Sequence, residues 1–270
     1  MKFINTPYNY TGSKFNLLEQ IVPLFDYSKK YFVDLFTGSF VVAANVVDKY
    51  ERVLANDIIG DLIGIHKNMI NNTDEFIEKV KNLSVPCKAS QEEYNKLRES
   101  YNNEKTPEKL YALMLSCTNN MIRYNKSMNV NQTWGKRCFN DNTQKKIDEF
   151  VKYIQPYKDK IYFSSRNFNE INIFKPSMIY CDPPYSNSES GYNNIWSEHD
   201  DLKLYLYCKE LDKLGSSFMV SGVLSHDGES CVLLDNLKSD GYKITELNFD
   251  YNKVSRKGKK ETTEVVITNY

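Results

Sequence analysis

The chain lacks several features that would assign it to a protein class at once. Its 35 lysines and arginines balance 35 aspartates and glutamates, so the formal net charge is zero and a uniformly basic nucleic-acid binder is excluded. The six cysteines include no C-x-x-C pair, which indicates neither a zinc site nor a disulfide framework. No apolar run is long enough to span a bilayer, and the first residues contain no signal-peptide core. We therefore expect a cytoplasmic protein with no bound metal and no membrane partner.

The composition and the spacing of the apolar residues predict a packed α/β protein. Hydrophobic residues make up 41% of the 270-residue chain, which is enough for a core and argues against global disorder. Apolar segments at 31–36 and 52–55 flank a helical pattern at 40–49, the strand, helix, strand unit of a parallel sheet. Further strand-like segments lie at 161–164, 178–181, 217–221, 245–251 and 262–268, and the last two predict a terminal antiparallel hairpin.

Between these two groups of strands, the pattern is helical. Apolar stripes recur at helical spacing, and Thr106-Pro107 is typical of a helix start, with threonine as N-cap and proline in the first turn. We predict a sheet domain made of residues 1–60 and 151–270, with a helical domain of residues 61–150 inserted in it.

Cations are concentrated in two stretches, although the total charge is zero. Charge runs are more often solvated faces than binding sites, yet two of them in a neutral chain favour a polyanionic partner. The first stretch holds Arg123, Lys126, Lys136, Arg137, Lys145 and Lys146 against Asp141 alone. The second holds Lys253, Arg256, Lys257, Lys259 and Lys260.

Aspartates stand at the ends of predicted strands. Asp34 begins a turn that contains Gly38, Asp57 follows the second strand, and Asp182 follows the segment 178–181. In an open parallel sheet, ligands bind outside the carboxyl ends of the strands, and an acid about 20 residues after the first turn can accept hydrogen bonds from ribose hydroxyls. Because the turn lacks the G-x-G-x-x-G pattern of a pyrophosphate cradle, a nucleoside cofactor without phosphates, such as S-adenosylmethionine, fits better.

Asp182-Pro183-Pro184-Tyr185 is the most informative stretch of the chain. A carboxylate, two rigid prolines and an aromatic ring at a strand's carboxyl edge can hold a flat, amino-bearing ring by hydrogen bonds and stacking. The alternative is an ordinary proline-rich turn after a buried strand. Its position after the cofactor-type turns and the helical segment favours a role in chemistry.

The chain resembles the Dam-type DNA adenine methyltransferases, in which the target-recognition region lies between the cofactor motif and the catalytic tetrapeptide. The likeness rests on residues 10–14, on 32–38 with Asn56-Asp57, and on 182–185, in that family's order. It is strongest to the short Dam enzymes of T-even-like phages and to GATC-modifying partners of restriction enzymes. It implies an α/β, Rossmann-like methyltransferase fold: a mostly parallel sheet with a terminal antiparallel hairpin and a helical target-recognition insertion.

The resemblance also implies roles for the matching residues. Asp182 and the Pro183 carbonyl would hold the target amine, and Tyr185 would stack on an adenine flipped out of the duplex. The predicted catalytic residues are therefore Asp182, Pro183, Pro184 and Tyr185. The predicted S-adenosylmethionine-binding residues are Tyr10, Thr11, Gly12, Lys14, Asp34, Phe36, Thr37, Gly38, Ser39, Asp57, Ile58, Asn167, Phe168 and Asp182, with Tyr10 and Lys14 at the methionine end.

For the helical insertion, the resemblance implies that it reads the DNA. Arg137 matches a position where relatives place an arginine on guanine, the most common specific contact of that side chain. Lys126 and Lys136 suit phosphate contacts, and Trp134 suits a hydrophobic anchor better than a DNA contact. The predicted DNA-binding residues are Asn120, Met121, Arg123, Asn125, Lys126, Trp134, Lys136, Arg137, Arg256, Lys257, Lys259 and Lys260.

The function we expect is methyl transfer from S-adenosylmethionine to the exocyclic amine of adenine in double-stranded DNA, within GATC, leaving S-adenosylhomocysteine. Other planar amines suit the same tetrapeptide, so cytosine-amino methylation stays open. A DNA regulator that binds the cofactor without turnover is a second alternative. We expect a monomer in solution; more than one copy on DNA, and a cognate restriction endonuclease as partner, are also open.

Overall fold

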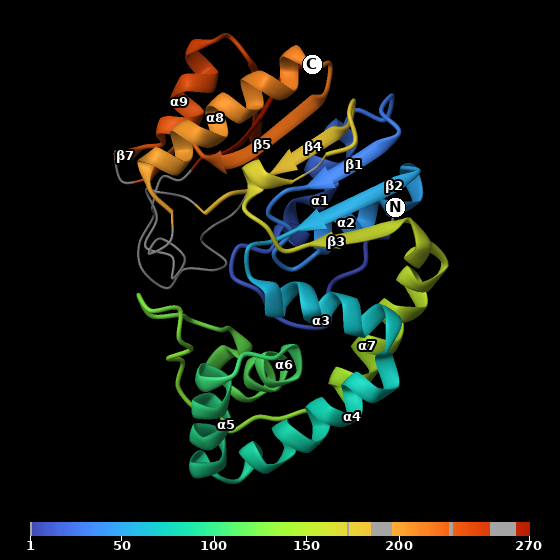
Figure 1. The fold of residues 1–270 in the computed structure, drawn as a ribbon, viewed down its shortest axis with the longest axis vertical. Coiled ribbons are helices and arrows are strands. Elements are labelled where there is room, and N and C mark those ends of the chain that lie inside the picture. Colours follow the sequence, from blue (N-terminus) through green and yellow to red (C-terminus); the bar gives the residue numbers. More distant parts are fainter. Residues whose placement is uncertain (1, 172, 185–195, 227–228, 249–262) are drawn as a thin grey trace.

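The computed structural model describes residues 2–171, 173–184, 196–226, 229–248 and 263–270. Its centre is a sheet with the strand order β3-β2-β1-β4-β5-β9-β8 (Figure 1). The strands are β1 (Tyr31–Asp34), β2 (Arg52–Asn56), β3 (Ile161–Ser164), β4 (Met178–Cys181), β5 (Ser217–Val223), β8 (Lys243–Leu247) and β9 (Glu264–Thr268). A separate short pair is formed by β6 (Ser225–His226) and β7 (Glu229–Ser230). Strands β1 to β5 run parallel to one another, whereas β9 runs antiparallel to β5 and β8, so the expected mixed α/β sheet with a terminal antiparallel pair is confirmed.

The order of the strands creates a switch point between β1 and β4. The chain first builds β2 and β3 on one side of β1 and then returns to place β4 on the other side. In register, Val33 lies beside Ile179 and Asp34 beside Tyr180, so the two strands end next to each other. A crevice outside the carboxyl ends of strands at such a point is the usual ligand site of an open α/β sheet.

The central strands are apolar on both faces because both faces are covered. Phe32 and Tyr180 belong to one core, while Val33 and Ile179, one position away, belong to the other. This is the burial expected of a parallel sheet with helices on both sides. The first core includes residues of α1 (Leu18–Ile21) and α2 (Val41–Val46), and the second includes residues of α8 (Glu198–Lys213) and α9 (Val232–Ser239).

A group of helices lies below the sheet in Figure 1. It consists of α3 (Gly60–Asn71), α4 (Thr73–Ser84), α5 (Gln91–Asn103), α6 (Pro107–Ser116) and α7 (Asp141–Ile154). The predicted N-cap is present, since the Thr106 hydroxyl accepts a hydrogen bond from the Lys109 amide at 3.4 Å. Leu62 of α3 and Leu110 of α6 belong to the same core cluster as Phe32, so the helices and one face of the sheet share a continuous core.

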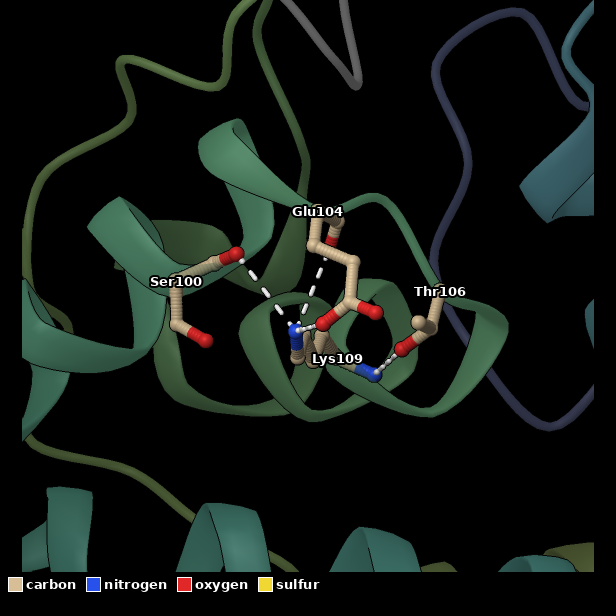
Figure 2. A network of polar contacts seen from close by, with 4 residues as sticks. All are labelled: Ser100, Glu104, Thr106 and Lys109. Carbon is tan, nitrogen blue, oxygen red and sulfur yellow. Dashed lines mark hydrogen bonds and ion pairs between the residues drawn. The ribbon is translucent and has the colours of Figure 1, made fainter.

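The corner between α5 and α6 is fixed by one lysine (Figure 2). Lys109 directs its ammonium group at the carbonyls of Ser100 (3.5 Å) and Glu104 (3.2 Å) and at the Glu104 carboxylate (2.7 Å). A cation near the last carbonyls of a helix also interacts favourably with the helix dipole. The carboxyl end of α5 is therefore held at a defined position against α6.

Residues 117–140 differ from the sequence expectation. We predicted helices up to about residue 150, but this stretch contains two extended arms joined by isolated bridges, Tyr124 with Val130 and Cys117 with Trp134. The prediction of helix is wrong here because the stretch is rich in asparagine, whose side chain competes with backbone hydrogen bonds of a helix. Asn119 and Asn120 both adopt positive φ, which ends the helical path after α6.

The carboxyl-terminal strands close one side of the sheet. β9 pairs with β5 along five residues and with β8 on its other side. Residues 249–262, which include the second cation-rich stretch, lie outside the described part of the chain. No helix within the described ranges is both long and apolar enough to cross a membrane.

Candidate functional site

A cavity of about 530 Å³ lies at the carboxyl ends of the strands around the switch point. This volume is typical of small-molecule sites in proteins. Its walls include every described residue that we predicted as catalytic or cofactor-binding. These are Tyr10, Thr11, Gly12, Lys14, Asp34, Phe36, Thr37, Gly38, Ser39, Asp57, Ile58, Asn167, Phe168, Asp182, Pro183 and Pro184.

Asp182 is held from two sides. It follows the last residue of β4, and its Oδ2 forms an ion pair with Lys14 at 2.8 Å. Its Oδ1 accepts a hydrogen bond from the Ser221 hydroxyl at 2.8 Å, and that hydroxyl contacts the Tyr180 hydroxyl at 3.0 Å. The orientation of the carboxylate is therefore set before any substrate arrives.

Lys14 lies deeper in the protein than a typical lysine. Its side chain is 7% exposed and that of Asp182 is 16% exposed. Burial is the largest single effect and lowers the pKa of Lys14. The charge of Asp182 and smaller contributions from Tyr180, from Glu264 and from the hydrogen bond to Asp182 together outweigh burial, so the pKa is raised above its usual value. The ammonium group thus stays charged opposite the carboxylate. The resemblance implied a contact of Lys14 with the cofactor, and the structure adds this contact with Asp182.

Asp34 carries its carboxyl into the turn after β1. It is 1% exposed, and Oδ2 accepts from the Thr37 hydroxyl at 3.0 Å. Burial raises the pKa of Asp34 to about 8, and the neighbouring charges of Asp182 and Asp57 act in the same direction. Asp34 is therefore largely protonated at neutral pH, whereas it would be ionised in water.

The turn at Gly38 requires glycine for two reasons. Its φ is +46°, and an added Cβ would lie 2.8 Å from the Tyr10 ring. The Gly38 amide donates to Asp57 Oδ2 at 3.0 Å, while the Ile59 amide donates to Asp57 Oδ1 at 2.9 Å. Burial raises the pKa of Asp57 to about 6, although these two amides lower it. Each carboxylate oxygen keeps acceptor capacity for a further hydrogen bond.

His66 of α3 supports the same turn from behind. Its Nε2, in the tautomer that carries the proton there, donates to the Gly38 carbonyl at 2.9 Å. Burial lowers the pKa of His66 to about 4, so the ring is neutral near pH 7. The sequence offered no signal for this contact, because a lone histidine on an apolar helix face is most simply a core residue.

An aromatic group forms another wall of the cavity. The ring centroids of Phe36 and Phe168 are 5.6 Å apart, and Trp196 lies 5.4 Å from Phe36 and 5.8 Å from Phe168. The Trp196 indole donates to buried Asp201 at 2.6 Å, which fixes the plane of the ring. Trp196 was not among the predicted residues.

Another wall comes from α5, the loop after it and the stretch 117–140. Tyr101, Lys105, Tyr124 and Met128 line the cavity from this side. The Tyr101 hydroxyl donates to Asp61 at the start of α3 at 2.8 Å. These residues carry no motif in the sequence, so only the packing of the helices against the sheet reveals them.

The predicted DNA-binding residues form two separate groups. In the first, Arg137 donates to Asn120 at 2.6 Å, and the Asn120 amide donates to the Met114 and Leu115 carbonyls at the end of α6. In the second, the Arg123 guanidinium donates to Asn131 at 3.1 Å. The side chains of Arg123, Lys126, Lys136 and Arg137 are all exposed.

Other predicted DNA-binding residues have partners within the protein. The Trp134 indole donates to the Cys87 carbonyl at 2.6 Å, as expected of an anchor, and the Lys136 ammonium lies 5.4 Å from its ring centroid. The Met121 sulfur accepts a hydrogen bond from the Thr11 hydroxyl at 3.8 Å, which joins this loop to the amino-terminal block.

Some predicted residues lie outside the described part of the chain. They are Tyr185, Arg256, Lys257, Lys259 and Lys260. Among the residues that the structure describes, no group of three or more His, Cys, Asp or Glu could hold a metal ion.

Ser221 was not among the predicted site residues, although it donates a hydrogen bond to Asp182. Strand register explains its place, since its neighbour Val220 pairs with Cys181 in the parallel β4–β5 ladder. The next residue on each strand is then Ser221 and Asp182. Knowledge that β4 and β5 are neighbours would have been enough to find this contact.

Comparison with known proteins agrees with this geometry. Residues 10–256 match the family model described as D12 class N6 adenine-specific DNA methyltransferase. The chain is 31% identical to the type II methyltransferase M.FokI of Planomicrobium okeanokoites, over 99% of this chain and 43% of that protein. It is 30% identical to the modification methylase StsI of Streptococcus sanguinis, over 100% of this chain and 43% of that protein.

A third relative is the DNA adenine methylase of Escherichia coli strain K12, which is 26% identical over 66% of this chain and 63% of that protein. The chain thus spans less than half the length of the two methylases that it matches over its whole length. With its strand order, its switch-point cavity and this match, the chain belongs to the D12 class N6 adenine-specific DNA methyltransferase family.

Proposed function

We propose that the protein transfers a methyl group from S-adenosylmethionine to N6 of an adenine in double-stranded DNA. The observation that supports this most directly is the carboxylate of Asp182, oriented between Lys14 and Ser221 at the mouth of a switch-point cavity. Membership of the family implies S-adenosylmethionine as the methyl donor.

The residues around the cavity fit this cofactor. Asp57 keeps acceptor capacity for ribose hydroxyls, and the Gly38 turn brings backbone close to the cavity. Asn167 and Phe168 would border the adenine, with Phe168 offering a ring face for stacking. Tyr10 and Lys14 would border the methionine end. When bound, S-adenosylmethionine supplies an electrophilic methyl group on a positively charged sulfur.

Asp182 would act on the target amine by orienting it. The lone pair of the adenine amine is delocalised into the ring, so the amine is a poor nucleophile. Accepting a hydrogen bond at Asp182, together with one at the Pro183 carbonyl, would hold the amine so that its lone pair points at the methyl carbon. The amine nitrogen would then bond to the methyl carbon as that carbon separates from sulfur, and the amine would pass its surplus proton to Asp182 or to water. Positioning and fixed charges supply the catalysis, without a covalent enzyme intermediate.

The adenine must leave the duplex to reach this cavity. An enzyme that modifies a base extrudes it, at a cost of a few kcal/mol for unstacking. Stacking by Tyr185 and contacts of the residues around 118–124 would offset this cost. The segment 61–150 would read the flanking bases through its non-helical stretch 117–140, with Arg137 on a guanine and Lys126 and Lys136 on phosphates.

The target sequence that we propose is GATC. The proposal follows from the resemblance to Dam-type enzymes and not from any contact in the structure. A role beside a restriction endonuclease is consistent with the names of two relatives, a type II methyltransferase and a modification methylase.

The test is nucleoside mass spectrometry of DNA that lacks adenine methylation, after incubation with the protein and S-adenosylmethionine. We expect N6-methyladenine with the wild type and with Asp159→Ala, an exposed aspartate that does not line the cavity, and none with Asp182→Ala. Methylated cytosine in place of methyladenine would overturn the assignment to adenine. Cofactor binding without any methylation would favour a regulator. Sequencing of the methylated positions tests GATC.

A further inference from the structure

Helix α5 holds the second arm of the Arg123–Gln132 hairpin by side-chain hydrogen bonds to its backbone. The amide of Asn102 makes two of them, accepting from Val130 N–H at 2.8 Å and donating to the Val130 carbonyl at 3.1 Å. Tyr94 and Arg98 both donate to the Gln132 carbonyl, at 2.8 and 3.2 Å. Just past the end of the helix, Lys105 donates to the Met128 carbonyl at 3.0 Å.

The spacing on both sides explains why these contacts coincide. Tyr94, Arg98 and Asn102 are four residues apart and lie on one helix face. Their backbone partners are alternate residues of an extended arm, which direct their N–H and C=O groups to the same edge. The odd residues of that arm face the other way, since the Asn131 amide donates to the Arg123 carbonyl at 3.0 Å. The side chains of α5 therefore supply the hydrogen-bond partners that a neighbouring strand would supply to the backbone of this arm.

Both ends of this arrangement are rigid. The carboxyl end of α5, where Asn102 and Lys105 lie, is held against α6 by Lys109 (Figure 2). At the tip of the hairpin, the Asn125 carboxamide oxygen accepts from the Ser127 and Asn129 amides, both at 3.0 Å. The hairpin is thus a preformed unit whose place relative to the sheet is set by α5.

The two faces of the hairpin meet different surroundings. On the inner face, Tyr124 is buried, and Tyr124 and Met128 line the same cavity as Asp57 and Asp182. On the outer face, Arg123 and Lys126 are exposed. A displacement of the hairpin would therefore change the cavity wall and the cationic surface together.

We infer that Asn102 is the positioning residue of this hairpin, and that the α5 clamp couples cofactor binding to DNA binding. The clamp consists of Tyr94, Arg98, Asn102 and Lys105. In its clamped position the hairpin closes the cavity with Tyr124 and Met128 while it presents Arg123 and Lys126 to the DNA backbone. Binding of either ligand then favours the clamped position of the hairpin, which the other ligand also requires. By linkage, each ligand raises the affinity of the protein for the other. The inference rests on the proposed function.

The test compares Asn102→Ala with Asn103→Ala, a matched change at the next position of the same helix, where the side chain is exposed. Dissociation constants are measured for S-adenosylhomocysteine with and without DNA, and for a duplex that the wild type methylates. Loss of two hydrogen bonds in Asn102→Ala is expected to weaken the binding of S-adenosylhomocysteine and of DNA about tenfold each, and to reduce the effect of DNA on cofactor affinity. Hydrogen exchange of the Val130 amide, which loses its acceptor, is expected to become faster. Asn103→Ala is expected to behave as the wild type does.

Equal behaviour of the two variants in these measurements would overturn the inference. So would faster exchange at Val130 with unchanged affinities, since the hairpin would then move without effect on either ligand. If Asn102→Ala fails to fold, Arg98→Met removes one clamp contact outside the cavity wall and takes its place. If the wild type methylates no DNA, the proposed function fails, while binding of S-adenosylhomocysteine and the exchange of Val130 still test the clamp.

Discussion

The edge of the sheet and the Arg123–Gln132 hairpin hold their polar groups in different ways. At the sheet edge, buried side chains of opposite charge hold each other, as Lys14 and Asp182 do at 2.8 Å. In the hairpin, side chains of α5 such as Asn102 and Arg98 hold backbone groups, and the charged residues Arg123 and Lys126 stay exposed. A buried ion pair is rigid, and removal of one partner is strongly destabilising because the other charge stays buried without compensation. An exposed cation contributes little free energy as long as it has no phosphate partner. Changes at the sheet edge should therefore have large effects, and changes at the exposed surface small ones.

Among changes to the residues that hold Asp182 or lie on the hairpin, the largest effect is expected from Lys14→Met. Removal of the ammonium leaves the Asp182 carboxylate partly buried without its ion-pair partner and free to reorient. We expect kcat to fall by about 10²–10³-fold, as on loss of one fixed group that stabilises charge in a transition state. The measurement is single-turnover methylation, with circular dichroism as a check on folding.

Ser221→Ala provides the milder comparison at the same carboxylate. It removes one hydrogen bond to Asp182 Oδ1 and keeps the ion pair, so the fall in kcat should be about tenfold. A larger loss from Ser221→Ala than from Lys14→Met would contradict the primary role that we give to the ion pair.

Asp34→Asn is expected to change how stability depends on pH. Burial raises the pKa of Asp34 to about 8 in the folded protein. Between the lower pKa of this carboxyl in the unfolded chain and pH 8, the folded protein therefore binds a proton that the unfolded chain has lost. The free energy of unfolding of the wild type should therefore fall as pH rises through this window, by an amount on the order of a few kcal/mol. Asp34→Asn should flatten the dependence.

Urea denaturation of the cofactor-free protein at pH 5, 6.5 and 8 measures this effect. The control is Asp159→Asn, an exposed aspartate that should leave the pH dependence as it is in the wild type. Parallel pH curves for wild type and Asp34→Asn would show that Asp34 does not titrate in this window.

Arg137→Ala tests the guanine contact that we propose. Loss of a bidentate arginine should reduce discrimination at one base pair by about 1–3 kcal/mol and leave discrimination at the other positions unchanged. Competition binding with duplexes substituted at each target position measures it. A uniform loss across all duplexes would mean that Arg137 contacts phosphate.

The smallest effect is expected from Lys126→Ala, at the exposed tip of the hairpin. Loss of one phosphate contact should weaken binding about equally on all sequences and lower the slope of log affinity against log salt by about 1. Measurement of affinity at several salt concentrations decides this. A change in sequence preference with an unchanged slope would argue for a base contact.

Much of the sheet edge could be predicted from the sequence, and little of the hairpin. The strands that end at Asp34, Asn56 and Cys181 appear in the sequence as apolar runs followed by polar residues, and the structure has all of them. The non-helical stretch 117–140 was missed because its asparagine-rich arms show no strand alternation. Its structure depends on α5 side chains that supply the backbone partners.

By itself, the sequence determined the local elements and the residues at their ends, because apolar periodicity and turn chemistry act over a few neighbouring residues. Together with the family resemblance, that information predicted the cavity residues near the strand ends, such as Lys14, Asp57 and Asp182, but it missed Trp196 and Tyr124. Only the tertiary structure decided which of them touch. The ion pair of Lys14 with Asp182 and the two hydrogen bonds of Asn102 with Val130 join residues that are distant in the chain. Such contacts follow from the order of strands and the packing of helices, which depend on the burial of the whole core and not on any local pattern.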